Sequence, residues 1–216
     1  MRKAAQQKSD KNKNMTKKRK QVIVLVSVLA VLLIAGVITL VFIFNKGISA
    51  SKDADELLDE YEQESTTENG EDEYSSAERN LDADAIDKYD VMAKLSIESL
   101  SLELPVISKM DDEALRVSVC YYKGAIIGEK GNMVITGHNF ASGAHFGNLD
   151  RIKIGDIVSL FGPDNKEYRY RVYDTEVVNP DDIEALNEYE GEYALTLLTC
   201  VNNGNSRLLV RCTMSK

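Results

Sequence analysis

The sequence predicts an all-β domain, a barrel or a sandwich, over residues 91–216, preceded by one membrane-spanning helix and an acidic linker. Short β-rich runs separated by turn residues recur from about residue 91 onward, with few helical patterns between them. Near the N-terminus lies a run of 23 residues without a charge. Residues 51–90 carry sixteen Asp and Glu against three Lys and Arg. These observations divide the chain into four segments: 1–20, 21–44, 45–90 and 91–216.

Residues 1–20 form a basic tail with nine Lys and Arg against one Asp. The uncharged run from Val22 to Phe44 follows it. At about 1.5 Å rise per residue, such a helix crosses a hydrocarbon core about 30 Å thick. A cleaved signal peptide, the alternative, would have an apolar region of only about 7–15 residues. We therefore predict a transmembrane signal anchor over 21–44, with the tail in the cytoplasm and the C-terminal domain outside the cell.

Residues 45–90 are predicted to be an acidic, largely disordered linker. The segment has few large aliphatic residues, so it cannot bury enough surface to offset the entropy lost on folding. Leu57, Leu58 and Tyr61 have helical spacing but form only a thin apolar face. The alternative is that this segment folds back over the domain as a regulatory lid.

Six β-rich runs account for most of the C-terminal domain. The clearest period of two lies in residues 166–178, where Tyr168, Tyr170 and Val172 share one face. Short helices are expected over 111–118, which has acidic residues in its first turn, and over 179–189. The predicted strands lie within 91–107, 132–137, 155–162, 166–178, 193–200 and 206–214.

Cys200 is the candidate nucleophile. The three cysteines, Cys120, Cys200 and Cys212, are an odd number, so at least one is free or pairs with another molecule. Cys200 ends the run "YALTLLTC", a position that a buried packing residue or an aimed nucleophile could both occupy. His138 directly follows the strand 132–137 and Gly137. If the two strands are neighbours, the thiol lies beside an imidazole that can accept its proton.

A positive charge for the oxyanion of an acyl-transfer intermediate is available in Arg207, which opens the strand after Cys200. A hairpin would bring its guanidinium back beside the thiol. Arg211 has the same strand parity but lies about 13 Å further along the strand, so a structural or surface role is favoured for it.

The remaining features favour no other chemistry. His145 lies in a polar loop, and a surface or hydrogen-bonded role is expected for it. Its spacing from His138 matches no compact pair of zinc ligands, so neither a metal nor a cofactor is expected. Residues 91–216 are mildly acidic, which argues against nucleic-acid binding.

Four segments resemble the motifs of the sortases, the membrane-anchored cysteine transpeptidases of Gram-positive bacteria. "TLLTC" at 196–200 is similar to their TLxTC signature, and "GNMVITGHNF" at 131–140 to their strand and histidine. "FGNLDRIKIGDIV" at 146–158 resembles the family's helical turn followed by "GD" and a strand. "RLLVR" at 207–211 resembles the family's arginine strand. The likeness covers about residues 92–214. It implies an eight-stranded sortase barrel with Cys200 as nucleophile, His138 as acid/base and Arg207 as oxyanion and substrate stabiliser.

The resemblance also implies a substrate and partners. The substrate would be an LPxTG-like sorting signal on a surface protein, cleaved through a thioester on Cys200. The acceptor would be an amine from a peptidoglycan precursor or a pilin lysine. Two alternatives remain open, a membrane-tethered binding or scaffold domain with a degenerate site and a hydrolytic cysteine peptidase. The subclass also stays open, because residues 51–90 contain no proline to mark the lid of pilus-assembling sortases.

Overall fold

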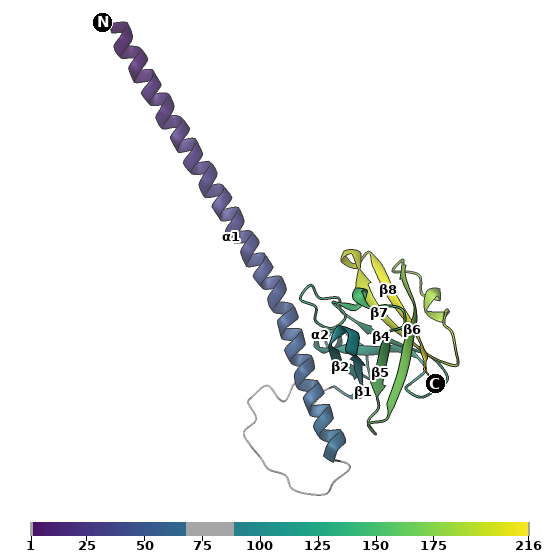
Figure 1. The fold of residues 1–216 in the computed structure, drawn as a ribbon. Helices are drawn as coiled ribbons and strands as arrows, with labels where there is room; N and C mark the ends of the chain where they lie inside the picture. The colour runs from purple at the N-terminus through teal and green to yellow at the C-terminus, as the bar shows by residue number, and fades with distance from the viewer. Residues whose placement is uncertain (1, 68–88, 216) are drawn as a thin grey trace. The chain divides into compact units, whose positions relative to one another are not determined.

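A computed structural model describes residues 2–67 and 89–215 of the chain (Figure 1). These residues form two compact units, 1–45 and 46–216. Helix α1 (Arg2–Thr67) contributes to both units. The first unit consists of the N-terminal part of α1, and the second contains all the strands.

The N-terminal part of α1 contains the predicted membrane-spanning segment. By length and composition, one stretch of this helix is apolar enough to cross a membrane, with a mean hydropathy of 2.8. None of that stretch is buried inside the protein. The large apolar side chains between Leu25 and Ile43 that the structure describes are exposed, whereas a core helix would cover them.

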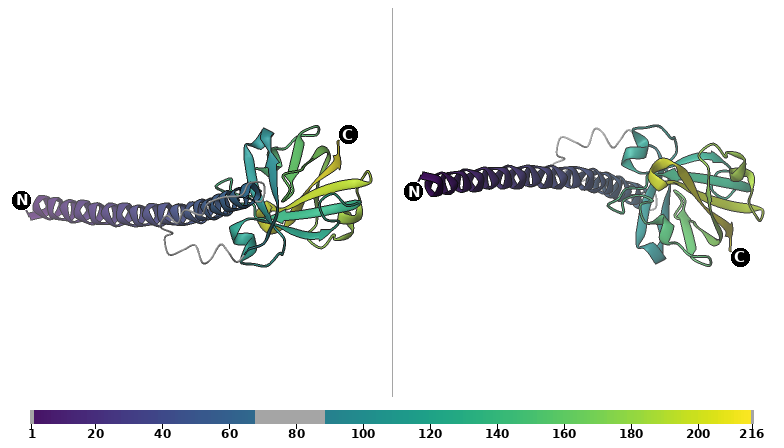
Figure 2. Two further views of the ribbon diagram at one scale, coloured as in Figure 1. Left: turned by 90° about the horizontal axis from the view of Figure 1, so that it is seen from below. Right: turned by 90° about the horizontal axis from the view of Figure 1, so that it is seen from above.

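Eight strands close into a barrel, which confirms the predicted all-β class and the eight-stranded architecture (Figures 1 and 2). Their order around the barrel is β1-β2-β3-β4-β7-β8-β6-β5. The β2–β3 and β4–β7 pairs are parallel, and the other pairs are antiparallel. The strands are β1 (Val91–Ile97), β2 (Leu102–Ile107), β3 (Val119–Gly124), β4 (Gly131–Gly137), β5 (Ile157–Phe161), β6 (Glu167–Val178), β7 (Tyr193–Val201) and β8 (Ser206–Met214).

Short helices connect the strands. Of the two predicted helical segments, the first contains helix α2 (Ala114–Val117) and the second a 3₁₀ turn, η4 (Glu184–Asn187). The other 3₁₀ turns are η2 (Glu98–Leu100), η3 (Leu149–Arg151) and η5 (Asn202–Gly204).

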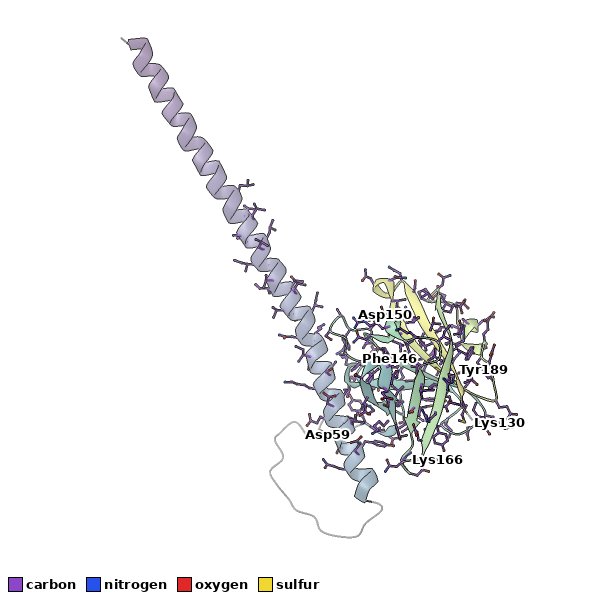
Figure 3. The ribbon with its side chains drawn as sticks, in the orientation of Figure 1. Asp59, Lys130, Phe146, Asp150, Lys166 and Tyr189 are labelled. Atoms are coloured by element: carbon purple, nitrogen blue, oxygen red, sulfur yellow. The ribbon has the colours of Figure 1, made fainter. Side chains whose placement is uncertain are left out.

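Alternating side chains on the strands fill the interior. In β1, Ala93, Leu95 and Ile97 are fully buried, while the residues between them are only partly covered. Phe146, labelled in Figure 3, joins this core from the loop after β4 and is also fully buried. The loop that follows the candidate histidine is therefore anchored in the barrel core.

Over residues 46–67 the structure departs from the predicted disordered linker. This segment is helical and packs on the barrel: Ala54 belongs to the main core, and Leu57 to a cluster with Ile107 and Cys120. The buried positions are Gly47, Ala50, Ala54, Leu57, Leu58 and Tyr61. Three of these are Gly or Ala, which let a helix approach a sheet closely although they are not large aliphatic residues. The rest of the predicted linker, 68–88, lies outside the described residues, as does any lid formed by it.

Polar contacts also hold this part of α1 on the barrel. Lys94 of β1 donates a hydrogen bond to Glu62 at 2.6 Å, and the Tyr61 hydroxyl donates to the Phe161 carbonyl at 3.4 Å. Near the start of the segment, a Cβ on Gly47 would collide with the Ser142 hydroxyl, so glycine is needed there for the close approach. We call residues 46–63 of α1 the docked segment.

Candidate active site

Strand pairing brings Cys200 and His138 together. Strands β4 and β7 run in parallel, and Gly137 pairs with Thr199. The next residue on each strand is His138 and Cys200, so both lie at the same edge of the barrel. A meeting of the thiol and the imidazole requires these two strands to be neighbours, and they are.

Arg207 lies on the other side of Cys200. The two residues are direct partners in the antiparallel β7–β8 pair. The chain reverses between them through η5, where Asn202 and Asn203 adopt left-handed φ values of 52° and 55°. Asparagine tolerates this conformation better than most residues. All three candidate residues thus line one cavity of about 350 Å³.

Side-chain hydrogen bonds link the two strands at the site. The Thr199 hydroxyl donates to the Gly137 carbonyl at 2.8 Å, directly before the two candidate residues. Asn139 donates from Nδ2 to the Cys200 carbonyl at 2.8 Å. A bond from the Thr136 hydroxyl to the Leu198 carbonyl at 3.3 Å lies one step further back. These bonds hold the backbones on either side of His138 against the backbone of Cys200.

Gly137 is required where β4 ends. A Cβ at this position would lie 2.6 Å from a methyl group of Val119 and 3.0 Å from the Phe146 ring. Because both neighbours are fully buried, neither has room to move. The glycine therefore allows the strand to deliver His138 to the rim without displacing the core.

His138 is half-buried, and its environment favours the neutral imidazole. Burial lowers the pKa of His138 below its usual 6.5, and the nearby Arg116 lowers it further, while Asp112 opposes them. A neutral imidazole is a proton acceptor. His138 is therefore suited to take a proton from a neighbouring thiol.

Cys200 differs from the other two cysteines in its exposure. All three are free, but Cys120 and Cys212 are fully buried, whereas Cys200 is only partly covered. Burial raises the pKa of Cys120 to about 12, with Asp111 adding to the effect, and burial also raises the pKa of Cys212. Those two thiols stay protonated and inert at neutral pH. The accessible thiol is the one at the site.

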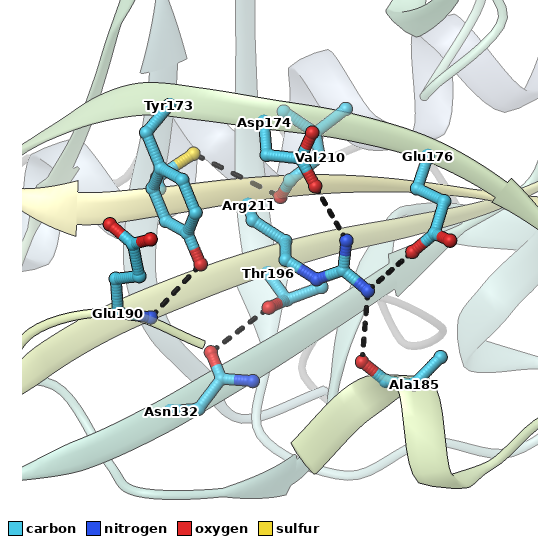
Figure 4. A network of polar contacts seen from close by, with 10 residues as sticks. Asn132, Tyr173, Asp174, Glu176, Ala185, Glu190, Thr196, Val210 and Arg211 are labelled. Atoms are coloured by element: carbon cyan, nitrogen blue, oxygen red, sulfur yellow. Dashed lines mark hydrogen bonds and ion pairs between the residues drawn. The ribbon is translucent and has the colours of Figure 1, made fainter. Parts of the chain in front are cut away.

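The two arginines differ in burial and in their partners. Arg207 donates from Nη1 to the carbonyls of Gly204 and Ser206, at 2.9 and 3.2 Å, and stays partly exposed at the cavity. Arg211 is only 4% exposed and binds Asp174 and Glu176 at 2.7 Å each (Figure 4). It also donates to the Ala185 carbonyl of η4 at 3.1 Å. Arg211 is thus a structural residue that ties η4 to the barrel.

The walls of the cavity come from elements that no sequence motif connects to the site. Leu115 of α2 and Leu186 of η4 line it, with Ile183 just before η4. Both short helices were predicted. Their packing beside Cys200 depends on the conformation of the connecting loops, which no local sequence pattern predicts. The apolar lining consists of Met110, Leu115, Tyr122, Val178, Pro180, Ile183, Leu186, Leu198 and Leu209.

His145 lies outside the cavity lining and is buried. Its side chain is 1% exposed, and its Nε2 lies 3.0 Å from the Val117 carbonyl. Of the two roles expected for it, surface or hydrogen-bonded, the structure has the second. Among residues 2–67 and 89–215, no group of three or more His, Cys, Asp or Glu is placed to hold a metal ion.

Comparison with known proteins places this geometry in a family. The family model described as the sortase domain matches residues 95–215, more than half of the chain. A sortase A from Bacillus anthracis is 34% identical over 119 residues, which cover 55% of this chain. The match spans 56% of that relative, so the chain covers little more than half of its length.

Solved structures show the same fold. A sortase D5 transpeptidase from Clostridium perfringens superimposes with a TM-score of 0.57 at 21% identity, covering 78% of this chain and 99% of that one. A lid mutant of sortase A from Corynebacterium diphtheriae gives a TM-score of 0.55 at 25% identity, covering 75% and 93%. The closed barrel, the matched domain and the order of the motifs lead to one conclusion: the chain belongs to the sortase family.

Proposed function

We propose that the protein is a cysteine transpeptidase that cleaves an LPxTG-like sorting signal and transfers the released acyl group to an amine. The observation that supports this most directly is the placement of Cys200 between His138 and Arg207 at one apolar cavity. A thiol, a proton acceptor and a fixed positive charge are the three groups that acyl transfer requires.

The first half-reaction forms a thioester. His138 takes the proton of the Cys200 thiol, and the sulfur attacks the carbonyl carbon of the threonine-like residue. The carbonyl oxygen becomes an oxyanion, which the guanidinium of Arg207 stabilises. When the C–N bond breaks, His138 gives its proton to the leaving amine. The substrate then remains bound to Cys200 through its acyl carbon.

The second half-reaction releases the product. An acceptor amine attacks the thioester, and its proton passes to His138. The C–S bond then breaks, and His138 returns the proton to the sulfur, which restores both the thiol and the neutral imidazole. The acceptor would be a peptidoglycan precursor or a pilin lysine, and the donors would be surface proteins that carry the sorting signal. If water attacked instead, the same residues would make the protein a hydrolytic peptidase.

Residues 21–44 are proposed to anchor the enzyme in the membrane, with residues 1–20 in the cytoplasm and the barrel outside the cell. The apolar, exposed stretch of α1 supports the anchor, and the Lys and Arg of the tail support the orientation. Protease treatment of intact cells tests it. The barrel should be digested while an epitope at the N-terminus survives, and survival of the barrel instead would reverse the orientation.

The activity is tested with the full chain in detergent micelles and quenched LPxTG-type peptides, with and without an added amine. We expect an acyl adduct on Cys200 in mass spectra, and a peptide–amine product only when amine is present. Cys200→Ala should abolish both, while the matched control Cys120→Ala should retain them. Peptide binding without any adduct would favour the scaffold alternative, and hydrolysis that amine does not divert would favour the peptidase.

A further inference from the structure

The loop after β4 brings His145 back to His138. Asn139 and His145 form an isolated antiparallel bridge, and the Phe146 amide donates to the His138 carbonyl at 3.0 Å. The backbone of His145 is therefore next to that of His138, although seven positions separate them. The loop that carries His145 is thus bonded to the backbone on both sides of the candidate acid/base.

The His145 imidazole is held by carbonyls from two other elements. Its Nε2 lies 3.0 Å from the carbonyl of Val117, the last residue of α2, and 3.4 Å from that of Ala50 in the docked segment. Carbonyl oxygens only accept hydrogen bonds, so Nε2 carries the proton. The other ring nitrogen, Nδ1, is buried and has no hydrogen-bond partner within the described part of the chain. The ring is thus neutral, with a defined tautomer.

A ring contact forms a second connection between the two histidines. Phe140 packs edge-on against both, with centroids 5.3 Å from His138 and 5.1 Å from His145. Edge-to-face contacts of this kind prefer a defined orientation. The orientation of the His138 ring is therefore sensitive to the position of His145 through Phe140 as well as through the backbone.

The chemistry of the buried ring argues against simple space filling. A buried polar nitrogen without a partner destabilises a fold, and a leucine or phenylalanine at the same place would avoid that penalty. Imidazole differs from those residues by its Nε2 proton. By hydrogen bonding through Nε2–H, the ring links the loop of His138 to both α2 and the docked segment.

We propose that His145 is a positioning residue, which holds the His138 loop opposite Cys200. It does so by donating hydrogen bonds from its Nε2–H group to the carbonyl oxygens of Val117 and Ala50. The inference rests on the proposed acyl-transfer role of His138. It also gives the docked segment a function, since Ala50 supplies one of the two acceptors. The helix that leads from the predicted anchor thereby becomes part of the support of the active site.

Two variants of the full chain in detergent micelles separate positioning from folding. His145→Gln keeps an N–H donor near the place of Nε2, whereas His145→Leu fills the space without a donor. We expect His145→Leu to lower kcat for the LPxTG-type peptide about tenfold or more with little change in KM, because the error lies in alignment of the reacting groups. His145→Gln should stay within about threefold of wild type.

A second readout does not depend on turnover. The chain contains only two histidines, so ring-labelled histidine gives two sets of NMR signals, each assigned by mutation. His145 of the wild type should appear as the Nε2–H tautomer. In His145→Leu the remaining His138 signal should shift and its pKa should rise toward the ordinary value, while in His145→Gln both should stay as in wild type.

Specific outcomes would overturn the proposal. A folded His145→Leu with normal kcat and an unchanged His138 signal would show that His145 positions nothing. Equal loss of kcat in both variants with an unchanged His138 signal would show a role in general stability only. If the wild type acylated no peptide, the proposed function would fail, while the NMR comparison would still decide whether His145 positions His138.

Discussion

Cys200 and Arg207 are paired residues of the antiparallel β7–β8 ladder, on opposite sides of the η5 turn, and both line the cavity. Their relative position is set by the hairpin backbone and hence by a rigid element of the barrel. The guanidinium already bonds two carbonyls of this hairpin, those of Gly204 and Ser206. The Arg207 side chain is therefore tied to the hairpin whose backbone also carries Cys200.

This placement predicts a large kinetic effect for Arg207→Ala. We expect kcat/KM for the LPxTG-type peptide to fall about 10²-fold or more, the scale for losing an oxyanion donor. The melting temperature should change little, because the side chain is partly exposed. Steady-state kinetics and thermal unfolding measure the two effects. Activity near that of the wild type would exclude Arg207 as the oxyanion stabiliser.

Arg211→Met should give the opposite pattern, a clear loss of stability with a smaller effect on kcat. It removes a buried guanidinium that binds Asp174, Glu176 and the Ala185 carbonyl, but keeps most of the apolar stem. The two carboxylates are nearly half exposed and regain water, so we expect a loss of about 1–3 kcal/mol in the free energy of unfolding.

Because Arg211 also holds η4, which lines the cavity, KM should rise more than kcat falls in Arg211→Met. Urea unfolding and peptide kinetics check these two effects. A 10²-fold loss of kcat here, with Arg207→Ala near normal, would mean that the roles of the two arginines are exchanged.

Gly47→Ala should disturb the docked segment. The added Cβ would collide with the Ser142 hydroxyl and lie 2.6 Å from the Ser142 Cβ, so the helix or the loop must shift. We expect lower thermal stability and a lower kcat. The double variant Gly47→Ala/Ser142→Gly removes the collision and should recover most of both, whereas Ser142→Gly alone serves as the matched control. Failure of the double variant to recover would show that this contact is not what limits docking.

The burial of His145 leads us to expect a specific pH dependence of stability. Burial lowers the pKa of His145 to about 4, its carbonyl contacts to Ala50 and Val117 oppose this, and the neighbouring His138 lowers it slightly further. In the unfolded chain the ring has its ordinary pKa of about 6.5, so the unfolded state binds the proton first as pH falls. The stabilisation is therefore complete above about pH 6.5 and declines as the pH falls toward about 4.

The decline corresponds to about 3 kcal/mol at most, since each pKa unit is worth about 1.4 kcal/mol. Urea unfolding across this pH range, compared with His145→Gln, measures it. The variant lacks the titrating ring, so the difference in unfolding free energy between the two proteins should change with pH. If the unfolding free energies of the two proteins ran parallel across the pH range, His145 would have the same pKa in the folded and unfolded states.

Local patterns in the sequence predicted seven of the eight strands and the nature of the candidate groups, but β3 (Val119–Gly124) lies in none of the six predicted runs. Period-two alternation, as at Tyr168, Tyr170 and Val172, reports on consecutive residues of one strand, and burial in the barrel follows it in part: Tyr170 and Val172 are buried, while Tyr168 is partly covered. The turn before Arg207 likewise predicted a hairpin, because the two strands are adjacent in the chain. The docked segment was missed, because its small residues become buried only against partners such as Ser142 that are far away in the sequence.

By itself, then, the sequence determined an all-β domain, an apolar helix near the N-terminus and a thiol, an imidazole and a guanidinium at strand ends. Only the tertiary structure decided that β4 lies parallel to β7, which puts His138 beside Cys200 across 61 intervening positions. It also decided that His145 is buried against Ala50 and Val117. The physical reason is the same in both cases. Hydrogen-bonding and hydrophobic periods describe neighbours along the chain, whereas contacts between distant segments depend on how the whole barrel packs.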